Sequence, residues 1–175
     1  MKTSKTIEEI EVALAKTAKF HYVRNLVVFN VYGYSARLLI DHECDMLIMS
    51  KSGYLTEVEI KRSWTDFLAD FKKSHRHDNA GIIKFFYYCV PLAMKESCEE
   101  VIEKEGLKCS GVITYDENLY IRFPESFCEI TPNQKLTAEQ QFELARLGTM
   151  RVVTLKNRLA KNEKKNSTGS LSAVV

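Results

Sequence analysis

The segment that decides the fold is residues 42–73, HECDMLIMSKSGYLTEVEIKRSWTDFLADFKK. Two runs rich in apolar and β-branched residues, 44–50 and 54–62, stand on either side of a short turn that contains Gly53. A glycine turn between two extended runs usually joins neighbouring antiparallel strands. We therefore predict a β-hairpin at the centre of the domain.

Further elements are predicted on both sides of this hairpin. Helical spacing of apolar residues and capping patterns predict helices over 6–19, 64–77, 94–105 and 137–162. Runs of β-branched and aromatic residues predict strands over 26–32, 84–90, 110–116 and 119–123. This alternation predicts an α/β fold, a mixed central β-sheet flanked by helices. We expect one domain over 1–163 and a disordered polar tail over 164–175.

The composition is that of a globular protein and excludes several classes. The chain has 175 residues and a net charge of +2, so any nucleic-acid binding must come from local clusters of charge. No apolar run approaches the roughly 18 residues of a membrane span, and no signal-peptide pattern precedes the first helix. The five cysteines form no CxxC pair, which favours buried free thiols over disulfides or a zinc knuckle. We expect a cytoplasmic protein with no membrane partner.

One face of the predicted hairpin carries an unusual set of charges. Side chains alternate along a strand, so Glu57, Glu59 and Lys61 share a face, and Asp45 lies on the partner strand. Such a face is costly to bury without a cation or open solvent. One alternative is a solvated face with cross-strand ion pairs. Glu57 does not fit the metal-site pattern and is expected to support the site or lie on the surface.

The same residue types suit metal-assisted phosphodiester hydrolysis. Carboxylate oxygens are ligands for Mg²⁺ or Mn²⁺, and a lysine beside them orients water or stabilises negative charge on phosphate. We therefore expect Asp45, Glu59 and the backbone carbonyl of Ile60 to bind the metal, and Lys61 to act on the water or the phosphate. His42 lies near Asp45 in the sequence and is a further candidate for contact with the site.

This segment resembles the core of the PD-(D/E)xK nucleases. The matching pattern is Asp45, a short turn, Glu59-Ile60-Lys61 on the next strand, and a helix containing Trp64-Thr65-Asp66-Phe67 and Ala69-Asp70. Small phage-type proteins and MmcB-like proteins of DNA repair are the most similar members, and they share a later strand that ends like Val90-Pro91. One departure is Cys44, which stands where the family pattern has proline. The resemblance spans residues 7–123 and implies a restriction endonuclease-like core that hydrolyses DNA.

A third carboxylate is expected from the first helix. Glu11 falls about 40° from Ile7 on a helical wheel, at about 100° per residue, and therefore lies within the apolar stripe. A carboxylate in a core-facing stripe needs a partner. In the family that the chain resembles, a glutamate of this helix often joins the metal site, which implies that role for Glu11. The alternative is a side chain at the edge of the stripe that reaches solvent.

Two basic segments are candidate nucleic-acid contacts. Lys72, Lys73 and Arg76 follow the hairpin's helix, and seven basic residues stand against one acidic residue between Arg146 and Lys165. Phosphate contacts are expected from Arg151, Lys156 and Arg158 in the last helix. Two other interpretations of that helix remain open, a solvated helix docked by its apolar side and a subunit interface.

Together these features predict a Mg²⁺-dependent deoxyribonuclease, an endonuclease of DNA repair or of phage and mobile elements. A nuclease-fold DNA-binding protein with weak or no catalysis is the first alternative, and an unrelated α/β protein with a charged hairpin is the second. RNA stays open as a substrate. A homodimer would suit cleavage of both strands of a duplex.

Overall fold

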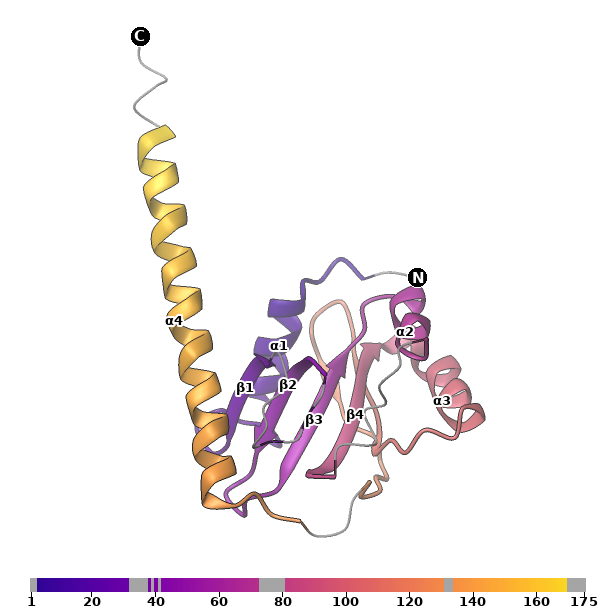
Figure 1. Ribbon diagram of the computed structural model, residues 1–175. Helices are drawn as coiled ribbons and strands as arrows, with labels where there is room; N and C mark the ends of the chain where they lie inside the picture. Colours follow the sequence, from indigo (N-terminus) through magenta and orange to yellow (C-terminus); the bar gives the residue numbers. More distant parts are fainter. Residues whose placement is uncertain are drawn as a thin grey trace.

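The computed structural model describes residues 3–31, 38, 40, 42–72, 81–130 and 134–169, with side chains described as far as residue 163. Its centre is a six-stranded sheet in which the strands stand in chain order (Figure 1). The strands are β1 (Leu26–Val31), β2 (Cys44–Met49), β3 (Leu55–Ile60), β4 (Ile83–Pro91), β5 (Gly111–Tyr115) and β6 (Ile121–Arg122). The helices are α1 (Ile7–Lys16), α2 (Trp64–Asp70), the short 3₁₀ helix η2 (Leu92–Met94), α3 (Lys95–Lys104) and α4 (Ala138–Gly169).

The predicted hairpin is the antiparallel pair β2–β3, in which Met46 lies opposite Val58. Gly53 supplies the left-handed backbone of the turn, with φ of 83°. Strands β3, β4 and β5 then run parallel, while β1 and β6 are antiparallel to their neighbours. Each pair of parallel neighbours needs a crossover connection. The crossover from β3 to β4 contains α2, and the crossover from β4 to β5 contains α3. The predicted fold class, a mixed α/β sheet flanked by helices, is confirmed.

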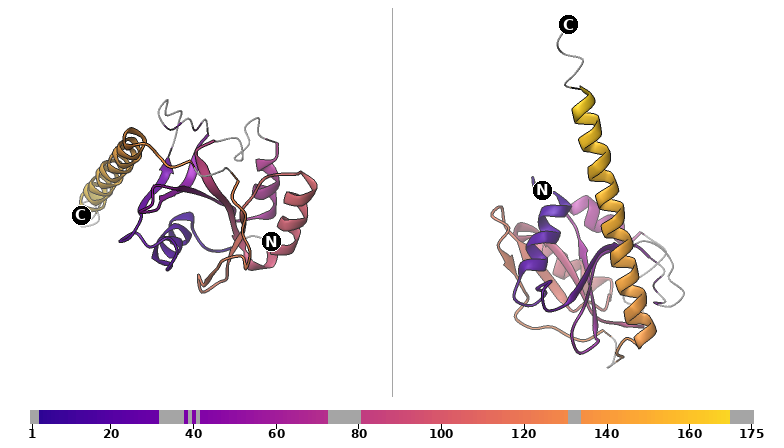
Figure 2. Two further views of the ribbon diagram at one scale, coloured as in Figure 1. Left: turned by 90° about the horizontal axis from the view of Figure 1, so that it is seen from below. Right: turned by 90° about the vertical axis from the view of Figure 1, so that its left-hand side faces the viewer.

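The sheet is buried on both faces. Helix α1 covers one face, where Ile10 and Leu14 pack on Val58 and Tyr87. The other face packs against α2, α3 and the start of α4 in a separate core that includes Phe67. Figure 2 shows α1 and the pair α2–α3 placed around different parts of the sheet. Burial on both faces explains why β3 and β4 are nearly continuous buried runs.

Helix α4 crosses the edge strand β1 and then projects beyond the sheet (Figure 1). Leu144 is fully buried at this crossing. Gly148 comes so close to Val28 that an added Cβ would lie 3.2 Å from its Cγ2. The helix continues to Gly169, past the end expected near residue 162, and residues 164–169, which we predicted to be disordered, are helical. The reason is that no proline or glycine interrupts the chain between Gly148 and Gly169.

Other boundaries differ from the prediction by a few residues. Helix α1 ends at Lys16 because the chain at Thr17 turns to an extended conformation, with ψ of 154°. Helix α2 ends at Asp70, and the rest of the helix predicted to residue 77 falls largely outside the described residues. Within the described part of the chain, no helix is long and apolar enough to cross a membrane.

Gly111 offers a test of the backbone that begins β5. Its φ is 143°, and a Cβ there would lie 2.7 Å from Cγ of Pro124. We expect Gly111→Ala to lower the free energy of unfolding by about 1 to 3 kcal/mol through strain and overlap. The measurement is urea unfolding followed by circular dichroism. Gly81→Ala is the control, since nothing lies within 4 Å of its added Cβ, and equal effects of the two substitutions would contradict the prediction.

Candidate active site

Lys61 lies at the centre of a buried ionic network just after the end of β3. Its Nζ is 2.8 Å from Oε1 of Glu59 and 3.0 Å from Oδ1 of Asp70. The hydroxyl of Tyr88 donates to the other Asp70 oxygen at 2.9 Å. All four side chains are buried, so these charges are enclosed rather than solvated. The lysine is thereby fixed in position from both sides.

The charge state of Lys61 follows from these contacts. Burial by itself would lower the pKa of the ammonium, but the negative charges of Glu59 and Asp70 outweigh it and raise the pKa above its usual value. Lys61 therefore carries a positive charge at neutral pH. It can stabilise negative charge or donate a hydrogen bond, but it cannot serve as a general base.

Asp45 lies beside this network on β2. Its Oδ2 accepts a hydrogen bond from the backbone N–H of Ile60 at 2.7 Å. Burial and the charge of Glu59 raise the pKa of Asp45 to about 7, against the opposing effect of that hydrogen bond. Asp45 and Glu59 therefore lie near enough to repel each other. Ile60 contributes its amide hydrogen to Asp45, and the expected role of its carbonyl as a metal ligand stays a prediction.

Glu11 approaches the same region from α1. It is buried, so the predicted alternative of a side chain in solvent is wrong. Burial raises its pKa to about 7; a hydrogen bond from Nδ2 of Asn30 opposes the rise, and the charge of Asp45 adds to it. Asp45 therefore acts electrostatically on Glu11, and the role of Glu11 in a metal site stays a prediction.

Asn30 was not among the predicted site residues. Its φ is 50°. The residue pairs of β1 and β2 on either side of it are Phe29–Met46 and Val31–Cys44, and Asn30 itself is not paired in this ladder. This irregularity lies beside Asp45 and lets the Asn30 amide reach Glu11. An asparagine inside an otherwise apolar strand was the available signal, because asparagine tolerates the left-handed region better than most residues.

Glu57 has a role that the sequence pattern left open. It is completely buried, so the surface position we considered for it is wrong. Nε2 of His42 lies 2.8 Å from its Oε1. Cys44 adjoins the pair, and burial together with Glu57 and Glu59 raises the pKa of its thiol well above the usual value. Among the described residues, His42, Cys44 and Glu57 form the only trio of candidate ligands whose atoms all lie within 4.8 Å of one another.

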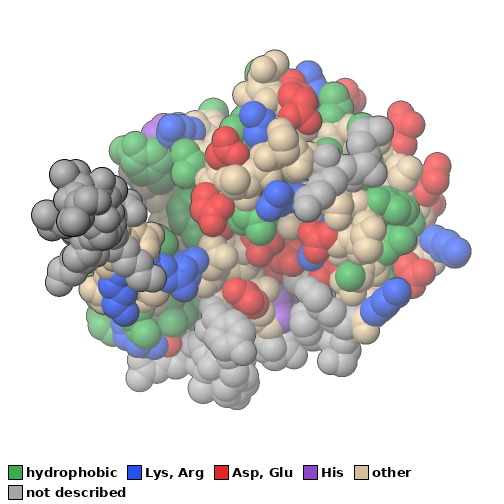
Figure 3. Space-filling view, turned by 90° about the horizontal axis from the view of Figure 1, so that it is seen from above, with side chains coloured by type: hydrophobic (Ala, Val, Ile, Leu, Met, Phe, Trp, Pro, Cys, Tyr) green, Lys and Arg blue, Asp and Glu red, His purple; other side chains and the backbone are tan. Residues whose placement is uncertain are grey.

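The predicted carboxylates Glu11, Asp45 and Glu59 do not form an equally tight trio in the described structure. Each is held by a different donor, Asn30, the Ile60 amide and Lys61 respectively. Like charges in a buried setting also repel one another. Seen from above, acidic side chains are visible around the middle of the surface, with a histidine near them (Figure 3).

The predicted nucleic-acid residues are spread over two places. Lys72 is exposed after α2, and Lys73 and Arg76 lie outside the described residues. On α4, Lys156 and Arg158 are exposed. Arg151 is half-buried, and its positive charge lowers the pKa of Glu11. Arg151 therefore connects the basic helix electrostatically with the acidic site.

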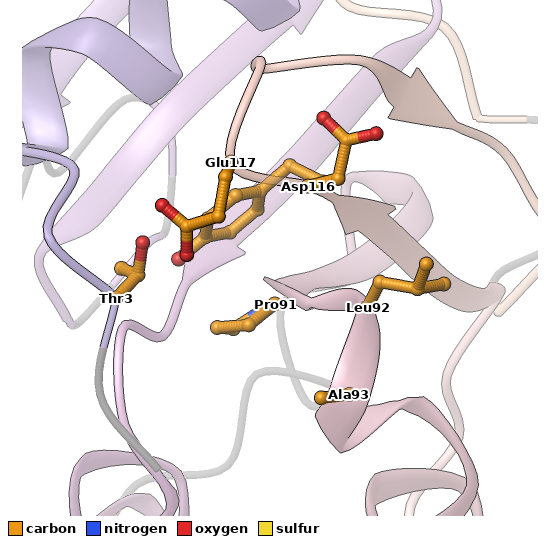
Figure 4. A pocket seen from close by; sticks show the side chains of 7 residues that line it. Thr3, Pro91, Leu92, Ala93, Asp116 and Glu117 are labelled. Carbon is orange, nitrogen blue, oxygen red and sulfur yellow. The ribbon is translucent and has the colours of Figure 1, made fainter.

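A separate recess of about 290 Å³ lies at the ends of β4 and β5, lined mainly by apolar surface (Figure 4). Asp116 and Glu117 stand at its border, while Pro91 and Leu92 form its floor. Asp116 accepts backbone hydrogen bonds from Asn118 and Tyr120, which gives it a structural role in the turn. None of the predicted site residues lines this recess.

Comparison with known proteins supports the fold alone. No protein-family model matches the chain, and a search of curated proteins found no match. Among solved structures, the chain is similar to the SPO1766 protein of unknown function from Silicibacter pomeroyi. The TM-score is 0.55 with 14% sequence identity, and the match covers 92% of this chain and 96% of that protein.

The raised pKa values of Glu11 and Asp45 predict an unusual dependence of stability on pH. Both carboxyls titrate near 7 in the folded protein and at ordinary acidic values when unfolded. Their contribution to stability is complete below the unfolded values and is lost as the pH rises through about 7. We therefore expect the free energy of unfolding, measured in EDTA, to fall between about pH 4 and about pH 7 and to level off above that.

The double variant Glu11→Gln/Asp45→Asn should flatten this dependence, because it removes both titrating groups. Glu100→Gln, at an exposed position of α3, serves as the control and should leave the slope unchanged. Urea unfolding at several pH values measures the effect. An unaltered slope in the double variant would show that other groups cause it.

Proposed function

We propose that this protein is a metal-dependent deoxyribonuclease of the PD-(D/E)xK type, which uses Mg²⁺ or Mn²⁺ and cuts within DNA strands. The observation that carries the proposal is the fixed ammonium of Lys61 beside Glu59, with Asp45 close enough to Glu59 to raise its own pKa. These are the residue types and the order that the resemblance to this family requires. Burial makes the arrangement costly to maintain without a function.

The donor set fits a hard divalent cation. Asp45, Glu59 and Glu11 offer carboxylate oxygens, which Mg²⁺ and Mn²⁺ prefer. Burial, with a smaller effect of neighbouring carboxylates, raises the pKa of Glu11 and of Asp45 to about 7, and a bound cation would stabilise the charged forms of both. When bound, the metal supplies positive charge to the phosphate in the transition state and promotes deprotonation of the attacking water.

The chain's own residues have separate tasks in this proposal. Lys61 keeps its proton and stabilises negative charge on the phosphate. Asp70 and Tyr88 hold the lysine in place and are positioning residues. Asp45 is a proposed ligand of the cation, and the hydrogen bond from the Ile60 amide at 2.7 Å holds its carboxylate in position.

Helix α4 is the proposed surface for the DNA backbone. Lys156 and Arg158 are exposed along it, and Arg151 stands near Glu11. A basic helix beside an acidic centre would hold the phosphates that the acidic residues alone repel. The contacts are to the backbone, so they would carry affinity without sequence preference.

A second candidate function is that of a DNA-binding protein with the same fold and little catalysis. The observation that favours it is the spacing of the carboxylates, since Glu11, Asp45 and Glu59 form no trio within 4.8 Å among the described residues. Metal binding separates the two candidates, because only the nuclease requires these carboxylates to draw together on a cation. A cellular role in DNA repair or in phage and mobile-element biology belongs to either.

The nuclease proposal predicts loss of cleavage when a carboxylate is neutralised. Asp45→Asn and Glu59→Gln should each slow nicking of supercoiled plasmid in Mg²⁺ by about a hundredfold or more, because both weaken the cation site. Titration calorimetry should show Mg²⁺ binding to the wild type and none to either variant. Glu100→Gln, on the exposed face of α3, should cut and bind metal like the wild type.

Lys61→Met tests the proposed role of the ammonium group. It should also abolish nicking, with circular dichroism as a check on folding because Glu59 and Asp70 lose their buried partner. Full activity in a folded Lys61→Met protein would remove the lysine from the mechanism. DNA binding without nicking in the wild type, under all Mg²⁺ and Mn²⁺ conditions, would favour the second candidate function.

The role of α4 predicts a change in the salt dependence of DNA binding. Each phosphate contact contributes about 0.9 to the slope of log affinity against log salt. We expect Lys156→Gln/Arg158→Gln to reduce that slope by about 1 to 2 and to weaken binding equally for unrelated sequences. Fluorescence anisotropy at several salt concentrations measures it. Lys95→Gln/Lys104→Gln on α3 removes the same charge elsewhere and should have little effect; equal slopes in the two variants would contradict the role of α4.

A further inference from the structure

A second group of candidate ligands lies beside the proposed nuclease centre. His42 precedes β2, Cys44 begins it, and Glu57 projects from β3. Their ligand atoms all lie within 4.8 Å of one another, and Nε2 of His42 is 2.8 Å from Oε1 of Glu57. The three residues are 4%, 0% and 0% exposed, so water does not compete for them.

The donor atoms differ in kind from those of the nuclease centre. They are an imidazole nitrogen, a sulfur and a carboxylate oxygen, the types that zinc accepts in tetrahedral sites, whereas Mg²⁺ avoids sulfur. Ligand atoms around tetrahedral zinc stand roughly 3.3 to 3.6 Å apart, given metal–ligand distances of about 2.0 to 2.3 Å. The His42–Glu57 contact of 2.8 Å would lengthen by about half an ångström to admit the ion, and the Cys44 sulfur lies within 4.8 Å of both partner atoms.

The surrounding charge favours a cation at this position. Glu57 and Glu59 point to the same face of β3, and Asp70 lies on that side as well. Lys61 forms ion pairs with Glu59 and Asp70. A dication at Glu57 would lower the cost of burying the carboxylate there and would stabilise Cys44 as the thiolate.

We propose that His42, Cys44 and Glu57 bind one Zn²⁺ ion, at a site distinct from the Mg²⁺ centre of the proposed nuclease. Two ligands belong to neighbouring strands and the third lies two residues before β2, so most of the site is built on rigid backbone. The ion would fix the segment at His42 to the β2–β3 hairpin. The site does not depend on DNA cleavage, and the failure of either proposal leaves the other standing.

The test uses the full chain and the metals alone. Protein purified without chelator and dialysed against metal-free buffer should retain about one zinc per chain by mass spectrometry of the metal content. Exchange for Co²⁺ should give the visible bands of a tetrahedral site and a sulfur-to-cobalt charge-transfer band. Excess Mg²⁺ should displace neither ion, because it does not compete for a thiolate.

Two variants and a matched control assign the ligands. Cys44→Ser should abolish the charge-transfer band and weaken zinc binding by at least about a hundredfold, and His42→Ala should weaken it similarly. Cys128→Ser removes an exposed thiol outside the trio and should change neither. Absence of the charge-transfer band in wild-type protein incubated with Co²⁺ would overturn the proposal, whether or not the variants fold. Zinc that binds equally to Cys44→Ser would overturn it as well.

Discussion

The structure depends on the burial of Lys61 between two carboxylates. An ammonium group in the interior is tolerated only when negative partners hold it at close range, and Glu59 and Asp70 do so at 2.8 and 3.0 Å. Neither carboxylate would be acceptable at that depth without the lysine. This mutual requirement fixes the end of β3 against α2.

The topology of the sheet makes this network possible. Because β3 and β4 run parallel, the chain must cross over between them, and α2 in that connection places Asp70 above the carboxyl end of β3. Tyr88 on β4 lies opposite Glu59 in the register, so its hydroxyl reaches Asp70 from the neighbouring strand. Residues of β3, α2 and β4 thus converge around Lys61. The same arrangement brings the carboxylates of Glu59 and Asp70 close together.

On the other side of Asp45 the arrangement depends on an irregular strand. The backbone of Asn30 enters the left-handed region, the ladder between β1 and β2 passes it by, and its amide holds Glu11. The charges of Asp45 and of Arg151 on α4 both affect the pKa of Glu11 at this position. The left-handed backbone at Asn30 thus places its amide against Glu11 of α1.

The sequence alone determined the elements, the hairpin and the fold class, because turn chemistry at Gly53 and the periodicity of apolar residues are local properties. It also indicated that Glu59 and Lys61 share a face, since side chains alternate along any strand. Only the tertiary structure decided that Asp70 balances Lys61, that Asn30 holds Glu11, and that His42, Cys44 and Glu57 meet. Those pairings arise from strand register, the crossover and the break in the β1–β2 ladder at Asn30, none of which leaves a periodic signal in the sequence.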